Sequence, residues 1–201
     1  MLRLKNLANK YQKRTCRPLY ANTQATPYAA KLSDSYRSSG VLSLPSAAAK
    51  LQNGLMPGMV VTRLKGTEQV AVTATAANSD VATEPAFGLL ANFVGGDLDE
   101  GFSGDSLQNE VGVWRGPDSV FEILAPAFND AGTLLDGSSI TGAQSLTAAI
   151  TAATAPGTDV LLYGGPDGRL VALSSAPSNK KPVARLVERV SASRIVVDLL
   201  V

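Results

Sequence analysis

The stretch VLLYGGPDGRLVAL, residues 160–173, decides the fold class. Two apolar runs rich in Val and Leu flank Gly164-Gly165-Pro166-Asp167-Gly168, a segment whose residue types favour tight turns. Apolar runs on either side of such a turn predict a β-hairpin. Because a strand and not a helix follows the glycines, we interpret the segment as a turn and not as a phosphate-binding loop.

The same pattern of short apolar runs, separated by Gly, Pro, Asn and Asp, extends over residues 54–201. Aromatic residues make up only 5% of the chain, so small and β-branched side chains must fill the core, with Trp114 and Phe121 as its large members. We predict a mainly β fold with a compact β-barrel or β-sandwich domain. The predicted strand pairs are 59–64 with 69–73, 110–115 with 119–124, 160–163 with 169–173, and 182–190 with 194–200.

Residues 139–155 follow a different pattern and are rich in Ala, Thr, Leu and Ile. Their spacing predicts one short helix, with Thr141 as its cap and Pro156 as its end. The apolar residues at helical spacing are Leu146, Ala149, Ile150 and Ala153.

Charge divides the chain, and the net charge of +1 is a cancellation between two regions. Asp34 is the only acid in residues 1–40, whereas Arg115 is the only basic residue in residues 78–136. We predict that residues 1–46 form a basic, extended N-terminal arm and that residues 47–201 form the β-rich domain. A disordered tail is the alternative for the arm.

The arm combines positive charge with tyrosines at regular spacing. Tyrosine gives a large contact area at a small cost in conformational entropy, so this combination suits docking on a partner protein. The candidate partner-binding residues are Arg3, Lys5, Lys10, Tyr11, Lys13, Arg14, Arg17, Tyr20, Tyr28, Tyr36 and Arg37.

A cluster of carboxylates follows Gly95-Gly96. Oxygen-rich loops can bind Ca²⁺, but the EF-hand spacing is absent, and charge runs usually mark solvated faces. The functional interpretation is an acidic loop that meets a basic patch on a neighbouring subunit. Its residues are Asp97, Asp99, Glu100 and Asp105.

The composition argues against catalysis. The chain has no histidine, which removes the commonest general base and the commonest metal ligand. Cys16 is the only cysteine, so neither an intrachain disulfide nor a thiolate zinc site can form. The segment Gly101-Phe102-Ser103-Gly104 lacks the G-x-S-x-G spacing of a nucleophile elbow. We predict no enzyme activity, no cofactor and no metal.

Nucleic-acid binding and export from the cytoplasm are the remaining possibilities. The basic arm could neutralise phosphates, but the acidic body would repel nucleic acid, and the expected stacking aromatics are few. The start Met1–Leu4 runs into Lys10 and Lys13 instead of an apolar segment, which predicts a protein made in the cytoplasm without a secretory signal and with no membrane span. An Arg-rich organelle leader is the alternative.

Three stretches resemble the capsid decoration (cement) proteins of tailed bacteriophages. They are GLMPGMVV at residues 54–61, VGVWRGPDSVFEILAP at 111–126, and GRLVAL at 168–173 followed by PVARLVE at 182–188. The resemblance covers residues 54–201 and consists of strands and turns without a catalytic signature.

The resemblance implies a structural virion protein that binds the outer surface of an icosahedral capsid and stabilises it. It further implies that the major capsid protein is the partner, and that the chain forms homo-oligomers, with trimers favoured. Two alternatives remain at this point: another phage structural β-barrel, such as a tail-tube or head-completion protein, and a nucleic-acid-binding module that uses the basic arm.

Overall fold

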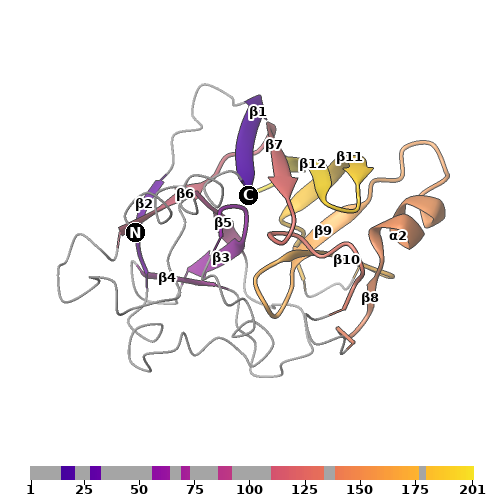
Figure 1. The fold of residues 1–201 in the computed structure, drawn as a ribbon, viewed down its shortest axis with the longest axis horizontal. Helices are drawn as coiled ribbons and strands as arrows, with labels where there is room; N and C mark the ends of the chain where they lie inside the picture. The colour runs from indigo at the N-terminus through magenta and orange to yellow at the C-terminus, as the bar shows by residue number, and fades with distance from the viewer. Residues whose placement is uncertain are drawn as a thin grey trace, which may run out of the picture.

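The computed structural model describes residues 15–20, 28–32, 56–63, 69–72, 86–91, 110–133, 139–176 and 180–201. Within these residues the chain forms two groups of β-strands and one short helix (Figure 1). The prediction of a mainly β fold with one short helix is therefore confirmed.

Seven strands form the larger sheet, in which all neighbours are antiparallel. The predicted hairpins at 160–173 and 182–200 are both present as neighbouring strands of this sheet. In spatial order the strands are β1 (Cys16–Tyr20), β7 (Ser119–Leu124), β12 (Arg194–Leu199), β11 (Ala184–Ser191), β9 (Leu161–Gly164), β10 (Leu170–Leu173) and β8 (Ala143–Gln144).

Five strands form the second group, and their pairing returns from the last strand to the first, so that they are joined in a ring. The predicted pair 59–64 with 69–73 is present here as β3 and β4. The ring order is β2 (Tyr28–Leu32), β4 (Gln69–Val72), β3 (Val60–Arg63), β5 (Ala86–Leu90) and β6 (Glu110–Trp114).

The predicted hairpin over residues 110–124 is wrong. Strand β6 pairs with β2 and β5 in the ring, whereas β7 pairs with β1 and β12 in the larger sheet. Gly116 (φ 117°) and Asp118 (φ 64°) have positive φ, with Pro117 between them. Through this turn the chain leaves β6 in the ring and enters β7 in the larger sheet.

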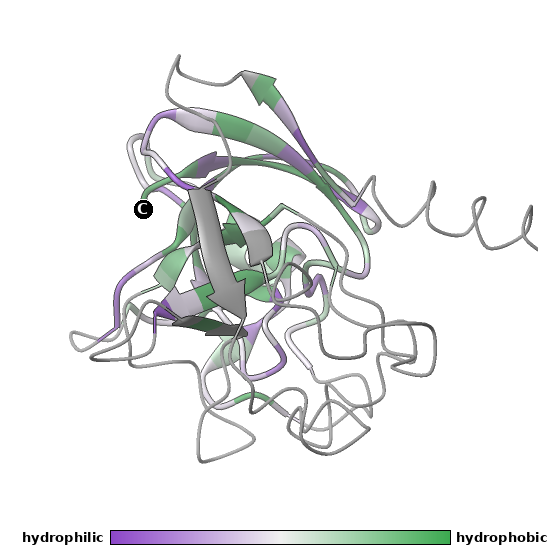
Figure 2. Cartoon of the chain, turned by 90° about the vertical axis from the view of Figure 1, so that its left-hand side faces the viewer, coloured by the Kyte–Doolittle hydropathy of each residue, from purple (hydrophilic) through white to green (hydrophobic). Residues whose placement is uncertain are grey.

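A hydrophobic core joins the two strand groups. It combines Val60 and Leu89 of the ring with Phe121 and Ile123 of β7, and half-buried Trp114 packs against it. The Trp114 and Phe121 rings lie 5.5 Å apart at 53°, a tilted contact between β6 and β7. Figure 2 shows hydrophobic and hydrophilic residues mixed along the strands, as expected for strands with one buried face.

The helix α2 (Leu146–Ala152) lies within the predicted range 139–155. Its cap is Ser145 and not Thr141, because the Ser145 hydroxyl accepts a 3.1 Å hydrogen bond from the Ala148 N–H. Leu146 and Ala149 face the core, while Ile150 is exposed. The apolar stripe is therefore narrower than the sequence predicts.

Two segments of the predicted arm are strands. Residues Cys16–Tyr20 form the edge strand β1, and Tyr28–Leu32 form β2 of the ring. The Leu124 N–H donates a 2.7 Å hydrogen bond to the Thr15 carbonyl. In an antiparallel pair the backbone N–H and C=O groups of alternate residues point toward the partner strand, so the backbone groups of Pro18 point away from β7. A proline without an N–H is tolerated at such an edge. The predicted boundary at residue 46 lies outside the described residues.

Cys16 is buried on β1, and burial raises the pKa of its thiol to about 12. Because the thiolate is the reactive form, we expect a disulfide reagent at pH 8 to label the native protein far more slowly than the protein unfolded in guanidinium. Absorbance of the released thiolate measures both rates. Equal rates would mean that β1 does not cover its cysteine.

Candidate interaction surface

Strands β1, β7, β12 and β11 turn one set of side chains away from the core. Residues directly opposite each other on paired strands share a face. The register sets Arg17 opposite Glu122, and Asp198 opposite both Val120 and Arg185. Val196 lies opposite both Glu122 and Glu188. We call this set the outer face. Its charged and apolar members are Arg17, Val120, Glu122, Leu124, Arg185, Glu188, Arg194, Val196 and Asp198.

Two arginines converge on one carboxylate at the β1 end of the outer face. Arg17 Nε lies 2.7 Å from Glu122 Oε1, and Arg194 Nε lies 3.4 Å from Glu122 Oε2. The Arg17 and Arg194 side chains are 60% and 48% exposed, whereas Glu122 is 9% exposed. The carboxylate therefore lies beneath the guanidinium groups, and the cluster has one net positive charge.

The opposite arrangement occurs at the β11 end. Arg185 Nη2 lies 2.5 Å from Asp198 Oδ2, and Arg185 Nη1 lies 3.4 Å from Asp159 Oδ2. The hydrogen bonds to Asp198 and Asp159 raise the pKa of the Arg185 guanidinium above its ordinary value. One arginine faces two carboxylates, so this cluster has one net negative charge.

Apolar side chains lie among these clusters. Val120, Leu124 and Val196 are half-buried on the outer face, and Leu19 and Val187 are exposed on β1 and β11. Arginine beside apolar area is the composition found in protein–protein contact surfaces, where acidic residues are depleted. Glu122 and Asp198 are buried beneath the arginines, whereas Glu188 and Asp159 are exposed. A partner can therefore reach the arginines, the apolar groups and these two exposed carboxylates.

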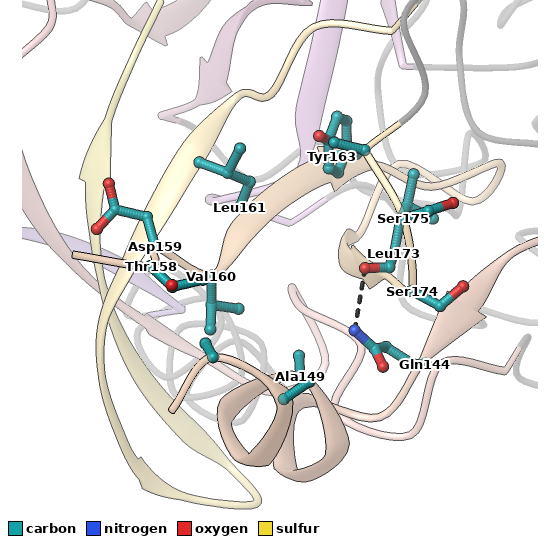
Figure 3. A pocket seen from close by; sticks show the side chains of 13 residues that line it. Gln144, Ala149, Thr158, Asp159, Val160, Leu161, Tyr163, Leu173, Ser174 and Ser175 are labelled. Carbon is teal, nitrogen blue, oxygen red and sulfur yellow. Dashed lines mark hydrogen bonds between the residues drawn. The ribbon is translucent and has the colours of Figure 1, made fainter. Parts of the chain in front are cut away.

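A groove adjoins this surface between α2 and strands β9 and β10 (Figure 3). It has a volume of about 290 Å³, and its walls include Ala149, Leu161 and Tyr163. Asp159, which pairs with Arg185, is also in its lining, so the groove is continuous with the β11 end of the outer face. Its walls also include polar side chains, among them Gln144 and Ser174.

Within the described residues, no three or more Cys, Asp or Glu residues are grouped so that they could hold a metal ion. Burial raises the pKa values of the Cys16 thiol and the Tyr163 hydroxyl, which keeps both groups neutral near pH 7. No helix in the described ranges is both long and apolar enough to cross a membrane.

Few of the predicted partner-binding residues lie in the described ranges. Arg17 does, and it is exposed while it pairs with Glu122. Tyr20 and Tyr28 lie on β1 and β2. The other predicted contacts lie outside the described residues: Arg3, Lys5, Lys10, Tyr11, Lys13, Arg14, Tyr36, Arg37 and the acidic residues Asp97, Asp99, Glu100 and Asp105.

Sequence reasoning missed Glu122, Arg185, Arg194 and Asp198. Arg194 and Asp198, an even number of residues apart in the otherwise apolar run 194–199, are a signal of a strand with one outward face. That signal identifies the face but not the neighbour, because strand order and register bring Arg17 to Glu122 from more than a hundred residues away along the chain.

Comparison with known proteins gives a family. No curated protein and no solved structure matches the chain. The family described as phage cement protein matches residues 1–200, almost the whole chain, which confirms the resemblance seen in the sequence. The chain belongs to the phage cement protein family, whose members have a structural role in stabilising the phage capsid.

Proposed function

We propose that this protein binds the outer surface of an icosahedral phage shell, with the major capsid protein as its partner. The observation that carries the proposal is the β1 end of the outer face, where exposed Arg17 and Arg194 lie over buried Glu122, beside half-buried apolar side chains. The protein would be made in the host cytoplasm and act as a homo-oligomer, with a trimer favoured.

The mechanism is interface burial. Contacts that exist only in the assembled shell stabilise that shell relative to separated subunits by mass action. A copy that touches several shell subunits through several surfaces gains avidity, because the later contacts form within the same complex. No chemical step is needed.

The basic arm and the acidic loop have distinct places in this proposal. The charged and tyrosine residues of the arm would extend the contact across neighbouring shell subunits. Asp97, Asp99, Glu100 and Asp105 would contact a basic patch on an adjacent subunit. Support for both comes from the charge division of the sequence.

We expect the purified protein to co-sediment with empty heads. Its affinity for the heads should fall as salt is added, but some binding should remain at high salt. Salt shortens the Debye length from about 10 Å at 0.1 M to about 3 Å at 1 M, which screens exposed ion pairs. Apolar contacts through Leu19, Val187 and the tyrosines are not screened in this way. Quantifying bound protein across this salt range measures the effect.

Free DNA is the matched comparison. For a DNA-binding protein, log affinity falls linearly with log salt concentration, and each neutralised phosphate makes this slope steeper by nearly one unit. Steeply salt-dependent DNA binding without affinity for heads would replace the proposed function with nucleic-acid binding.

A further inference from the structure

The cluster of Arg17, Glu122 and Arg194 has more hydrogen-bond donors than its own carboxylate can use. Each guanidinium group has five N–H donors, whereas a carboxylate accepts about four hydrogen bonds. The two shortest contacts use the Nε atoms, one to each oxygen of Glu122. Both guanidinium groups stay close to half exposed or more, so donors remain available at the surface.

The backbone fixes this arrangement. Arg17 lies directly opposite Glu122 on the edge pair β1–β7, and Arg194 lies diagonally opposite on β12. Cross-strand neighbours at these positions are within reach of long side chains. Side chains from three strands thus place two guanidinium groups around the Glu122 carboxylate. The ion pairs restrict the arginine rotamers, so less conformational entropy is lost when a ligand binds.

We infer that Arg17 and Arg194, held by Glu122, receive a carboxylate side chain of the shell subunit. This inference rests on the proposed function. A single carboxylate cancels the net positive charge of the cluster, and the guanidinium fork matches carboxylate geometry. Val120, Leu124 and Val196 beside the cluster supply apolar area for a protein partner, which a nucleic-acid phosphate would leave unused.

The main test replaces both arginines, in the variant Arg17→Gln with Arg194→Gln, and measures head binding by co-sedimentation. Truncating a desolvated interfacial charge pair commonly costs enough for a loss of affinity of at least about tenfold. Arg115→Gln combined with Lys181→Gln is the control with the same change of charge, because both residues are exposed and lie outside the cluster. Arg115 is exposed on the turn after β6 and lies over the Phe87 ring, so this control should lose much less than the Arg17 and Arg194 variant.

A second variant changes binding in the opposite direction. Glu122→Gln keeps the size of the side chain but leaves two positive charges without their internal carboxylate. We expect head binding to depend more steeply on salt than in the wild type, because the shell carboxylate then faces two positive charges that no internal carboxylate offsets. A residue with only a structural role would leave this salt dependence unchanged, and that result would overturn the inference.

The outcomes distinguish a failure of the proposed function from a failure of the inference alone. If the wild-type protein does not bind heads, the proposed function fails. If it binds and the double arginine variant binds equally, only the inference fails. If the variant loses its oligomeric state in analytical ultracentrifugation and not its head binding, the carboxylate belongs to a second copy, which also overturns the inference. Thermal melts of each variant verify folding.

Discussion

Replacing Phe121 with alanine is expected to lower the free energy of unfolding by about 3–5 kcal/mol. Phe121 is fully buried, belongs to the core between the strand groups, and packs against Trp114. The substitution removes apolar area and leaves a cavity where β6 and β7 meet. Guanidinium titration followed by circular dichroism gives the change.

Val187→Ala is the control, because Val187 is 56% exposed on β11. A surface substitution of this kind should change stability by about 0.5 kcal/mol or less. Trp114→Ala should cost less than Phe121→Ala because Trp114 is only half-buried. A Phe121→Ala variant as stable as Val187→Ala would show that the two strand groups do not depend on this contact.

Removing β1 is expected to have the second large effect. A chain that starts at Thr15 keeps every contact described above, whereas one that starts at Ala21 loses the burial of Cys16, the Arg17–Glu122 ion pair and the hydrogen bond from the Thr15 hydroxyl to the Pro57 carbonyl. Ladder hydrogen bonds and apolar burial together contribute at least about 3 kcal/mol. For a chain of this length that corresponds to a fall in Tm of roughly 6–12 °C.

Scanning calorimetry of the two truncated chains measures this difference. The shorter chain also exposes the edge of β7, so we expect it to aggregate more readily on heating. Equal melting temperatures would support the prediction from sequence that residues 1–46 are an arm separate from the folded domain. Head binding by both chains then measures what residues 15–20 add to attachment.

Local sequence patterns predicted most of the fold that is set by short-range interactions. The hairpin 160–173 has its turn residues between two apolar runs, and β9 and β10 pair as that pattern predicts. The short helix is also local in origin. The predicted hairpin over residues 110–124 is wrong. Gly116-Pro117-Asp118 correctly indicates a turn, but a turn sequence does not determine whether the next strand pairs with the previous one.

The candidate surface depends on long-range pairing, which is why sequence predicted only Arg17 of its charged residues. Arg17 was found through the charge of the N-terminal region, but its partner Glu122 belongs to a segment predicted to be acidic and separate. Asp198 and Arg185 are joined by the register of β11 and β12. No spacing rule in one sequence identifies such pairs.

Under the proposed function, copies lie close together on a shell, and Pro18 affects how their edge strands can meet. At high local concentration, edge strands of neighbouring copies can pair through backbone hydrogen bonds and form fibres. Pro18 interrupts the outward row of N–H groups on β1 and so weakens that route. Under the proposed function, oligomers bound side by side would then not grow into fibres through their β1 edges, and their spacing would follow the shell lattice beneath them.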